Sequence, residues 1–234
     1  MATGTATAEV VDLAETPLRD LNQRLHDLAR GGDGPRNWRI VNPSGAHNIA
    51  CGLDADIDVV IEGHAGYYCA GMNQRATVRV TGNAGQGVAE NMMSGRVTVD
   101  GNASQAAGAT AHGGLLHIRG DASARCGISL KGAAILVEGS IGHMSAFMAQ
   151  TGTIVVLGDA GDALGDSMYE THVYVRGTVA GLGADCVEKE LGDFHRAELG
   201  GLLAAAGVTG AGVGDFRRYG SARNLYTFKI DNVY

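Results

Sequence analysis

Residues 78–85 read Val78-Arg79-Val80-Thr81-Gly82-Asn83-Ala84-Gly85, and this pattern decides the fold. Nineteen residues later, residues 97–104 repeat it as Val-Thr-Val-Asp-Gly-Asn-Ala-Ser. The central glycine recurs at this spacing without a slip, at Gly63, Gly82, Gly101, Gly120, Gly139, Gly158 and Gly177. A fixed period of this length indicates a repeat architecture, in which each repeat buries its apolar face against its neighbours.

The positions before each glycine predict a short strand. Aliphatic residues, nearly all β-branched, stand four and two positions before it, and such alternation is typical of a strand with one buried face. The column four before is Val59, Val78, Val97, Leu116, Ile135, Ile154 and Val173. The column two before is Ile61, Val80, Val99, Ile118, Val137, Val156 and Val175. The residues between these columns, which include Arg79, Thr98, His117 and Tyr174, are expected to face outward.

The positions after each glycine predict corners. A turn-forming column comes first, at His64, Asn83, Asn102, Asp121, Ser140, Asp159 and Thr178. A mostly small column then returns to the interior, at Ala65, Ala84, Ala103, Ala122, Ile141, Ala160 and Val179. Seven positions past the glycine only Ala or Gly occurs, which allows close backbone packing at a second corner.

Nineteen residues are too few for a strand plus a crossover helix, which needs roughly 30. They suffice for one coil of a parallel β-helix. We therefore predict an all-β fold, a right-handed single-stranded parallel β-helix of about seven coils and about 34 Å in length. The six-residue period of left-handed solenoids and the glycine-aspartate pattern of calcium-binding rolls do not occur.

The segments outside the repeats divide the chain into three parts. Residues 1–37 are expected to form an N-terminal arm and a helix that caps the solenoid, with Thr16 as N-cap, Pro17 in the first turn and an end at Gly31. An apolar stripe marks the buried side of this helix, at Leu18, Leu21, Leu25 and Leu28. The solenoid is expected over residues 38–184, with an imperfect first coil at 39–52.

Residues 185–234 are expected to be a C-terminal helix and tail packed on the solenoid. The helix is predicted from Val187 to Ala206, and the basic, aromatic tail from Phe216 to Tyr234. The outward strand column becomes apolar late in the chain, at Leu136, Val155 and Tyr174. We interpret these three residues as the seat of the helix, with a partner interface as the alternative.

Composition and charge narrow the classes of function expected for this chain. The net charge of −7, with no cluster of Lys and Arg, argues against a nucleic-acid surface. No apolar run is long enough to span a membrane and no secretory signal opens the chain, so a cytoplasmic location is expected. Reduced thiols are then the expected state of the four cysteines, Cys51, Cys69, Cys126 and Cys186.

We predict no catalytic, cofactor-binding or metal-binding residues in this chain. Cys69 and Cys126 share a column but lie three coils apart, about 14 Å, whereas Zn–S bonds are about 2.3 Å. Asp159 belongs to the turn column, so Asp159, Asp162 and Asp166 are not interpreted as a calcium site or a glycosidase pair. The glycines of residues 210–214 imitate a dinucleotide fingerprint but lack its strand and helix.

Two sets of outward residues are candidates for surface roles. Asp100, Arg119 and Glu138 alternate in sign on successive coils and predict a ladder of surface ion pairs. Large apolar residues that are expected on the surface are candidate interface anchors: Tyr67, Tyr68, Met144 and Phe147.

The repeated pattern, seen again from Ile135 to Gly142, resembles the GXGXG β-helix domain that closes the large subunit of glutamate synthase. The resemblance covers roughly residues 38–234. Its end is similar to the family's Thr-Gly-Ser-x-x-Ala and F-x-K-V-x-P-x-x-Y motifs, through Tyr219 to Arg223, Phe228 to Ile230 and Tyr234, although Asp231-Asn232 replace the usual proline. The length and the N-terminal Val11-Asp12-Leu13 most resemble the stand-alone B subunit of N-methylglutamate synthase, the methylamine–glutamate N-methyltransferase.

This resemblance implies a division of labour. One partner subunit would be a glutaminase-like amidotransferase, and another a glutamate-synthase-like subunit with FMN and an iron–sulfur cluster. The present chain would be a structural subunit without an active site that holds both partners in a hetero-oligomer. The alternatives are a glutamate-synthase-like aminating oxidoreductase, the formylmethanofuran dehydrogenase subunit that consists of this domain and, more distantly, a solenoid carbohydrate-active enzyme, whose clustered carboxylates this sequence does not show.

Overall fold

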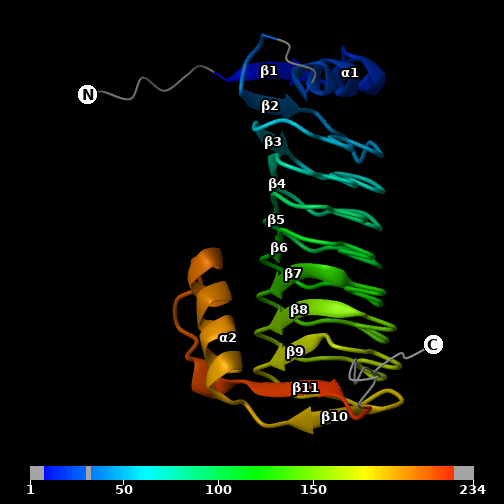
Figure 1. Ribbon diagram of the computed structural model, residues 1–234. Helices are drawn as coiled ribbons and strands as arrows, with labels where there is room; N and C mark the ends of the chain where they lie inside the picture. The colour runs from blue at the N-terminus through cyan, green and yellow to red at the C-terminus, as the bar shows by residue number, and fades with distance from the viewer. Residues whose placement is uncertain (1–7, 30–32, 224–234) are drawn as a thin grey trace, which may run out of the picture.

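The structure is a computed structural model that describes residues 8–29 and 33–223. It is a parallel β-solenoid of about seven turns with a helix at one end and a second helix along one flank (Figure 1). This architecture confirms the predicted fold class. Within the described ranges, neither helix is long and apolar enough to span a membrane.

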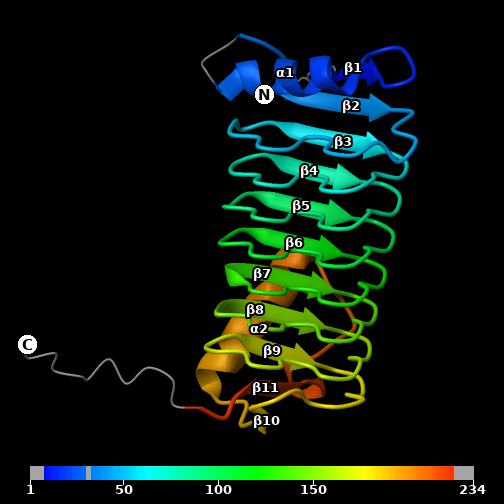
Figure 2. The same ribbon diagram turned by 90° about the vertical axis from the view of Figure 1, so that its right-hand side faces the viewer.

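One strand from each coil builds a continuous parallel sheet (Figure 2). Its strands are β2 (Asn37–Val41), β3 (Asp58–Glu62), β4 (Thr77–Val80), β5 (Arg96–Val99), β6 (Leu115–Ile118), β7 (Lys131–Val137), β8 (Thr151–Val156) and β9 (His172–Val175). Equivalent residues of successive coils pair, for example Val78 with Val97 and Val97 with Leu116. The 19-residue period of the sequence is therefore the register of the sheet.

The interior of the solenoid is filled by the predicted columns. From Val78 onward, every aliphatic residue four or two positions before the repeat glycine is 0% exposed. The small column forms a second parallel ladder of single bridges, beginning with Ala65 to Ala84 and ending with Ala160 to Val179. The predicted second corner lies in the left-handed region, with φ values of 52° at Ala70 and 66° at Gly108. Small residues are needed there because the position is buried in the core: Ala70, Ala89 and Ala146 are 0% exposed, and a Cβ on Gly108 would lie 3.2 Å from Leu116 Cδ2.

The N-terminal cap is present. β1 (Glu9–Asp12) pairs in parallel with β2, and α1 (Leu18–Ala29) covers the end of the core with Leu21, Leu25 and Leu28. The helix starts one residue later than expected, because the carbonyl of Pro17 accepts bonds from the N–H groups of Asp20 and Leu21. Pro17 thus takes the N-cap position that was predicted for Thr16. The predicted end at Gly31 lies outside the described residues.

The C-terminal segment differs from the prediction. Residues Cys186–Lys189 form strand β10, so the predicted helix from Val187 is wrong at its start, and α2 spans Asp193–Ala206. The short helix η1 (Val213–Asp215) precedes the predicted tail, which begins with strand β11 (Arg217–Ser221). The rest of the predicted tail, residues 224–234, lies outside the described residues. β11 runs antiparallel between β9 and β10. The side chains of Cys186 and Tyr219, 5% and 2% exposed, fill the end of the core, and this burial overrides local helix propensity.

Three residues that were expected to face outward are buried. They do point away from the interior of the coil, but Thr98 is 7%, His117 2% and Tyr174 0% exposed. Tyr174 lies beneath α2, which packs on this face of the sheet (Figures 1 and 2). The C-terminal end of α2 reaches β5, where Arg96 donates a hydrogen bond to the carbonyl of Ala205 at 2.9 Å. The predicted outward direction is therefore confirmed, and Tyr174 is buried because α2 packs over it.

Candidate functional site: the faces of the solenoid

The outer face of the sheet is occupied by the chain itself. Leu136, Val155 and Tyr174 are each 0% exposed and pack with Leu199 and Leu203 of α2. The predicted seat of the C-terminal helix is therefore confirmed, and these residues are not available to a partner while α2 is docked.

A polar network fixes α2 in place. The carboxylate of Glu198, on α2, accepts hydrogen bonds from the Tyr174 hydroxyl at 2.5 Å, from His172 Nδ1 at 2.9 Å and from the Thr153 hydroxyl at 3.1 Å. Burial alone would raise the pKa of Glu198, but these bonds outweigh it and lower that pKa. Burial, followed by the bond to Glu198, raises the pKa of Tyr174. This network of Glu198, Tyr174, His172 and Thr153, which we call the Glu198 clasp, holds α2 against the sheet.

The turn column forms a ladder of hydrogen bonds along one corner. Each side chain accepts a bond from the backbone N–H of the equivalent residue in the next coil. Examples are Asn83 Oδ1 with Asn102 N at 2.9 Å, Asn102 Oδ1 with Asp121 N at 2.8 Å, and Asp121 Oδ1 with Ser140 N at 2.8 Å. Asp159 accepts in the same way from Thr178 N at 2.6 Å. This use of Asp159 agrees with its interpretation as a turn residue rather than a ligand.

The predicted charge ladder is formed in part. Asp100 pairs with Arg119 at 3.1 Å and with Arg79 at 2.7 Å. Glu138 instead bonds His117 Nε2 at 2.7 Å, so the expected succession of pairs stops after Arg119. The pKa of the His117 imidazole is lowered, and burial of the ring is the largest cause. These pairs belong to the wall of the solenoid and stabilise it modestly.

The thiols are poor candidates for chemistry. All four cysteines are unpaired, and Cys69 and Cys126 are 0% exposed. Burial raises the pKa of Cys51 and Cys186 to about 11 and that of Cys126 to about 12. Thiols with such pKa values stay protonated at neutral pH, whereas nucleophilic attack and metal ligation require the thiolate. In the described part of the chain, no group of three or more His, Cys, Asp or Glu side chains is placed to hold a metal ion.

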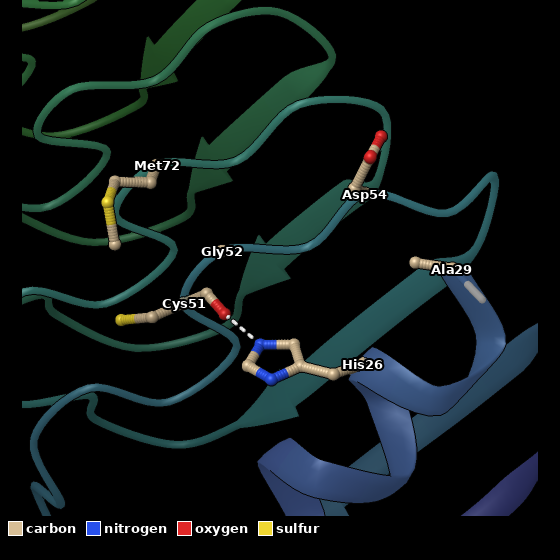
Figure 3. A pocket seen from close by; sticks show the side chains of 6 residues that line it. All are labelled: His26, Ala29, Cys51, Gly52, Asp54 and Met72. Carbon is tan, nitrogen blue, oxygen red and sulfur yellow. Dashed lines mark hydrogen bonds between the residues drawn. The ribbon is translucent and has the colours of Figure 1, made fainter.

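A shallow hollow of about 450 Å³ lies beside α1. It is lined by His26, Ala29, Cys51, Gly52, Asp54 and Met72 (Figure 3). His26 Nε2 is tied to the carbonyl oxygen of Cys51 at 2.7 Å, which anchors the capping helix to the first coil. The histidine is therefore engaged in the cap.

The face of the solenoid opposite α2 is covered by no described helix or strand (Figure 2). Of the predicted interface anchors, Tyr67 is 46% exposed, and Tyr68, Met144 and Phe147 are half-buried. The structure brings Tyr67 and Tyr68 together, with ring centroids 5.8 Å apart. Met144 is in the same column as Tyr68 but four coils away, about 19 Å. The anchors therefore form two patches rather than one.

Exposed methionines extend both patches and were missed from the sequence. Met72 and Met148, which share a column, are 46% and 44% exposed. Tyr68, Met72, Met144 and Met148 adopt φ values of 59°, 55°, 54° and 50°. In the coils between, the equivalent positions hold mostly small or polar residues: Gly87, Asn91, Ala106, Thr110, Arg125 and Ser129. The signal in the sequence is that large apolar residues occupy these two columns only in the first and fifth of the coils compared, with small or polar residues between them.

Together these features define a class of protein, a β-solenoid of 19-residue coils whose interior is aliphatic and whose long flanks are surfaces. A family model described as the GXGXG motif matches residues 40–197. The chain belongs to this family, the glutamate synthase domain family that its repeats resemble. A curated relative, Protein GlxC of Rhizobium meliloti (strain 1021), is 57% identical over 224 residues, which are 96% of this chain and 98% of GlxC.

Proposed function

We propose that this chain is a non-catalytic structural subunit of a glutamate-synthase-like complex. The complex proposed is N-methylglutamate synthase, which converts glutamate and methylamine into N-methylglutamate and ammonia. In this proposal a glutaminase-like amidotransferase subunit and a subunit with FMN and an iron–sulfur cluster bind the solenoid, and both active sites lie on those partners.

One observation carries the proposal: the clustered polar side chains described above are bonded to the solenoid and its helices. The turn column bonds the next coil, Glu198 clasps α2 and His26 anchors the cap. The GXGXG family match and the 57% identity with GlxC support the same class of complex. The N-terminal resemblance to the B subunit of N-methylglutamate synthase supports the particular one.

The face opposite α2 is the proposed docking face. Its two patches, around Tyr67, Tyr68 and Met72 and around Met144, Phe147 and Met148, lie about 19 Å apart along one straight face. Exposed aromatic and methionine side chains of this kind are enriched in interfaces.

The test is co-purification from the native cells of the affinity-tagged chain. We expect the amidotransferase-like and flavin-containing subunits in fixed ratio, with flavin absorbance and methylamine-dependent formation of N-methylglutamate. Preparations that contain molybdenum or tungsten subunits, or no partners, would contradict the proposal.

A matched pair of variants tests the docking face. Tyr67→Ser should lower partner recovery while the melting temperature of the isolated chain stays within about 2 °C, because the side chain is half exposed. Gln86→Ser, at the same position of the next coil, is the control and should leave recovery unchanged. Equal recovery with both variants would show that the Tyr67 patch is not used.

A further inference from the structure

The two ends of the solenoid are finished differently. At the N-terminal end, α1 lays three leucines over the core. At the C-terminal end, β10 is the last strand of the sheet and α2 lies along the flank instead (Figure 1). One edge of β10 pairs with β11, and the other edge meets no described strand. An open edge presents unpaired N–H and C=O groups, and a solenoid normally needs a cover there.

Two cations are stacked beside this edge. Lys189 of β10 lies directly opposite Arg218 of β11. Both side chains lie on the same face, because a Cβ built on Gly220 would be 3.2 Å from Lys189 Cδ and 3.6 Å from Arg218 Nη1. Like charges directly opposite each other destabilise an antiparallel pair. In a chain of net charge −7, this placement calls for an explanation.

The acidic residues of the described region do not neutralise the pair. Neither Lys189 nor Arg218 is within ion-pair distance of a described carboxylate, and Arg218 Nε donates to the backbone carbonyl of Glu190 at 2.8 Å. The carboxylate of Glu188, also at this edge, lies 3.9 Å from Arg217 Nη1. Apolar surface lies close by in sequence, since Val187 is 37% and Phe194 67% exposed. The edge therefore combines backbone groups that meet no described strand, although Cys186 N and the Glu190 carbonyl have partners of their own, with exposed apolar side chains. The two cations share one face of β10 and β11, and Glu188 points to the other face.

We infer that the free edge of β10 binds an extended acidic segment of another protein, which adds one more strand to the sheet. Main-chain bonds would supply affinity, as in other strand-addition complexes. An acidic side chain next to Lys189 would complete a row with Lys189 and Arg218, and an apolar one would lie next to Val187. This inference deepens the proposed structural role, on which it rests for the identity of the partner.

A second copy of the chain fits this edge poorly. Antiparallel self-pairing centred on Glu188 sets two glutamates opposite each other, and pairing centred on Lys189 sets two lysines opposite each other. Pairing centred on Val187 leaves only residues 186–188 in register, because Asp185 has a φ of 62° and leaves the strand. Charge therefore favours an acidic partner over a copy.

Hydrogen exchange tests the inference. Only the backbone amides of Glu188 and Glu190 point to the free edge, because Cys186 N bonds the Gly183 carbonyl and Val187 and Lys189 face β11. We expect these two amides to exchange at least about tenfold more slowly in the complex purified from native cells than in the isolated chain. Lys189→Glu should abolish this protection, whereas Arg19→Glu, an equal charge change on an exposed residue of α1 at the other end of the solenoid, should not. Unchanged exchange of these two amides in an assembled complex would overturn the inference and leave the proposed function standing.

Synthetic peptides test the edge without the partner. The probes are two blocked hexapeptides, one of alternating valine and aspartate and one of alternating valine and lysine. The aspartate peptide should bind about threefold or more tightly than the lysine peptide, and Lys189→Glu should reverse the order. Equal binding of both peptides, or protection of the Glu188 and Glu190 amides in a dimer of the isolated chain, would overturn the inference.

Discussion

Val137→Asp is the sharpest perturbation of the repeat. Val137 is 0% exposed and lies between Ile118 and Val156, which are also 0% exposed. The new carboxyl group would stay protonated and neutral at pH 7. This requires its pKa to rise from about 3.9 to above 7, which costs about 4 kcal/mol. The lost apolar contacts add about 1–2 kcal/mol. We expect a total loss of about 5–6 kcal/mol, in a protein whose whole stability is on the order of 5–15 kcal/mol.

The assay is thermal and denaturant unfolding of the purified chain. A loss of this size should lower the melting temperature by roughly 10–20 °C. Because the folded-state pKa of the new carboxyl is raised, the defect should grow as the pH rises from 4 to 7 and shrink in acid. The control is Val10→Asp, the same change at a side chain that is 51% exposed, with an expected cost below about 0.5 kcal/mol. Equal melting of Val137→Asp and wild type would refute the inward-facing column.

Three further predictions use the same unfolding assay. Asp121→Ala removes the acceptor of the Ser140 N–H and should cost about 1–2 kcal/mol, whereas Asp121→Asn keeps an acceptor and should cost less; equal losses would argue against the ladder. Glu198 has a lowered pKa in the folded protein, so its contribution is present above about pH 4.5, its ordinary pKa, and lost as the pH falls through the folded value. Glu198→Gln should make stability depend less on pH in acid. An unchanged dependence of stability on acid pH would show that the Glu198 clasp does not stabilise the fold. Gly120→Ala should destabilise by more than about 1 kcal/mol because its Cβ would meet Asn102 Oδ1 and lie 2.8 Å from the Gly101 carbonyl oxygen, while Gly201→Ala, in open space on α2, should stabilise by about 0.5–1 kcal/mol; the reverse order would contradict the close coil stacking.

The coils could be predicted because one spacing fixes both period and face. A β-branched residue at every second position, repeated at 19 residues, leaves one register in which all such side chains are buried. The interior from Val78 to Val175 follows from that pattern alone. The seat of α2 could be predicted for a similar reason, since Leu136, Val155 and Tyr174 break the outward polar column.

The ends could not be predicted, because no repeat constrains them. Val187 lies in a Leu-, Ala- and Glu-rich stretch with helical propensity, but closure of the last coil by Cys186 and Tyr219 makes it a strand. The insertion of β11 between β9 and β10 depends on residues some 30 apart and leaves no local signal. The exposure of Met72 and Met148 likewise depends on the left-handed turns that present them.

In the proposed function this chain supplies surfaces and its partners supply the chemistry. The most direct measurement is the methylamine-dependent synthesis of N-methylglutamate, together with flavin absorbance, by the isolated chain and by the complex purified through it. We expect neither property in the isolated chain and both in the complex, with loss of both when the partners are removed. Turnover or stoichiometric flavin in the isolated chain would contradict the proposed function.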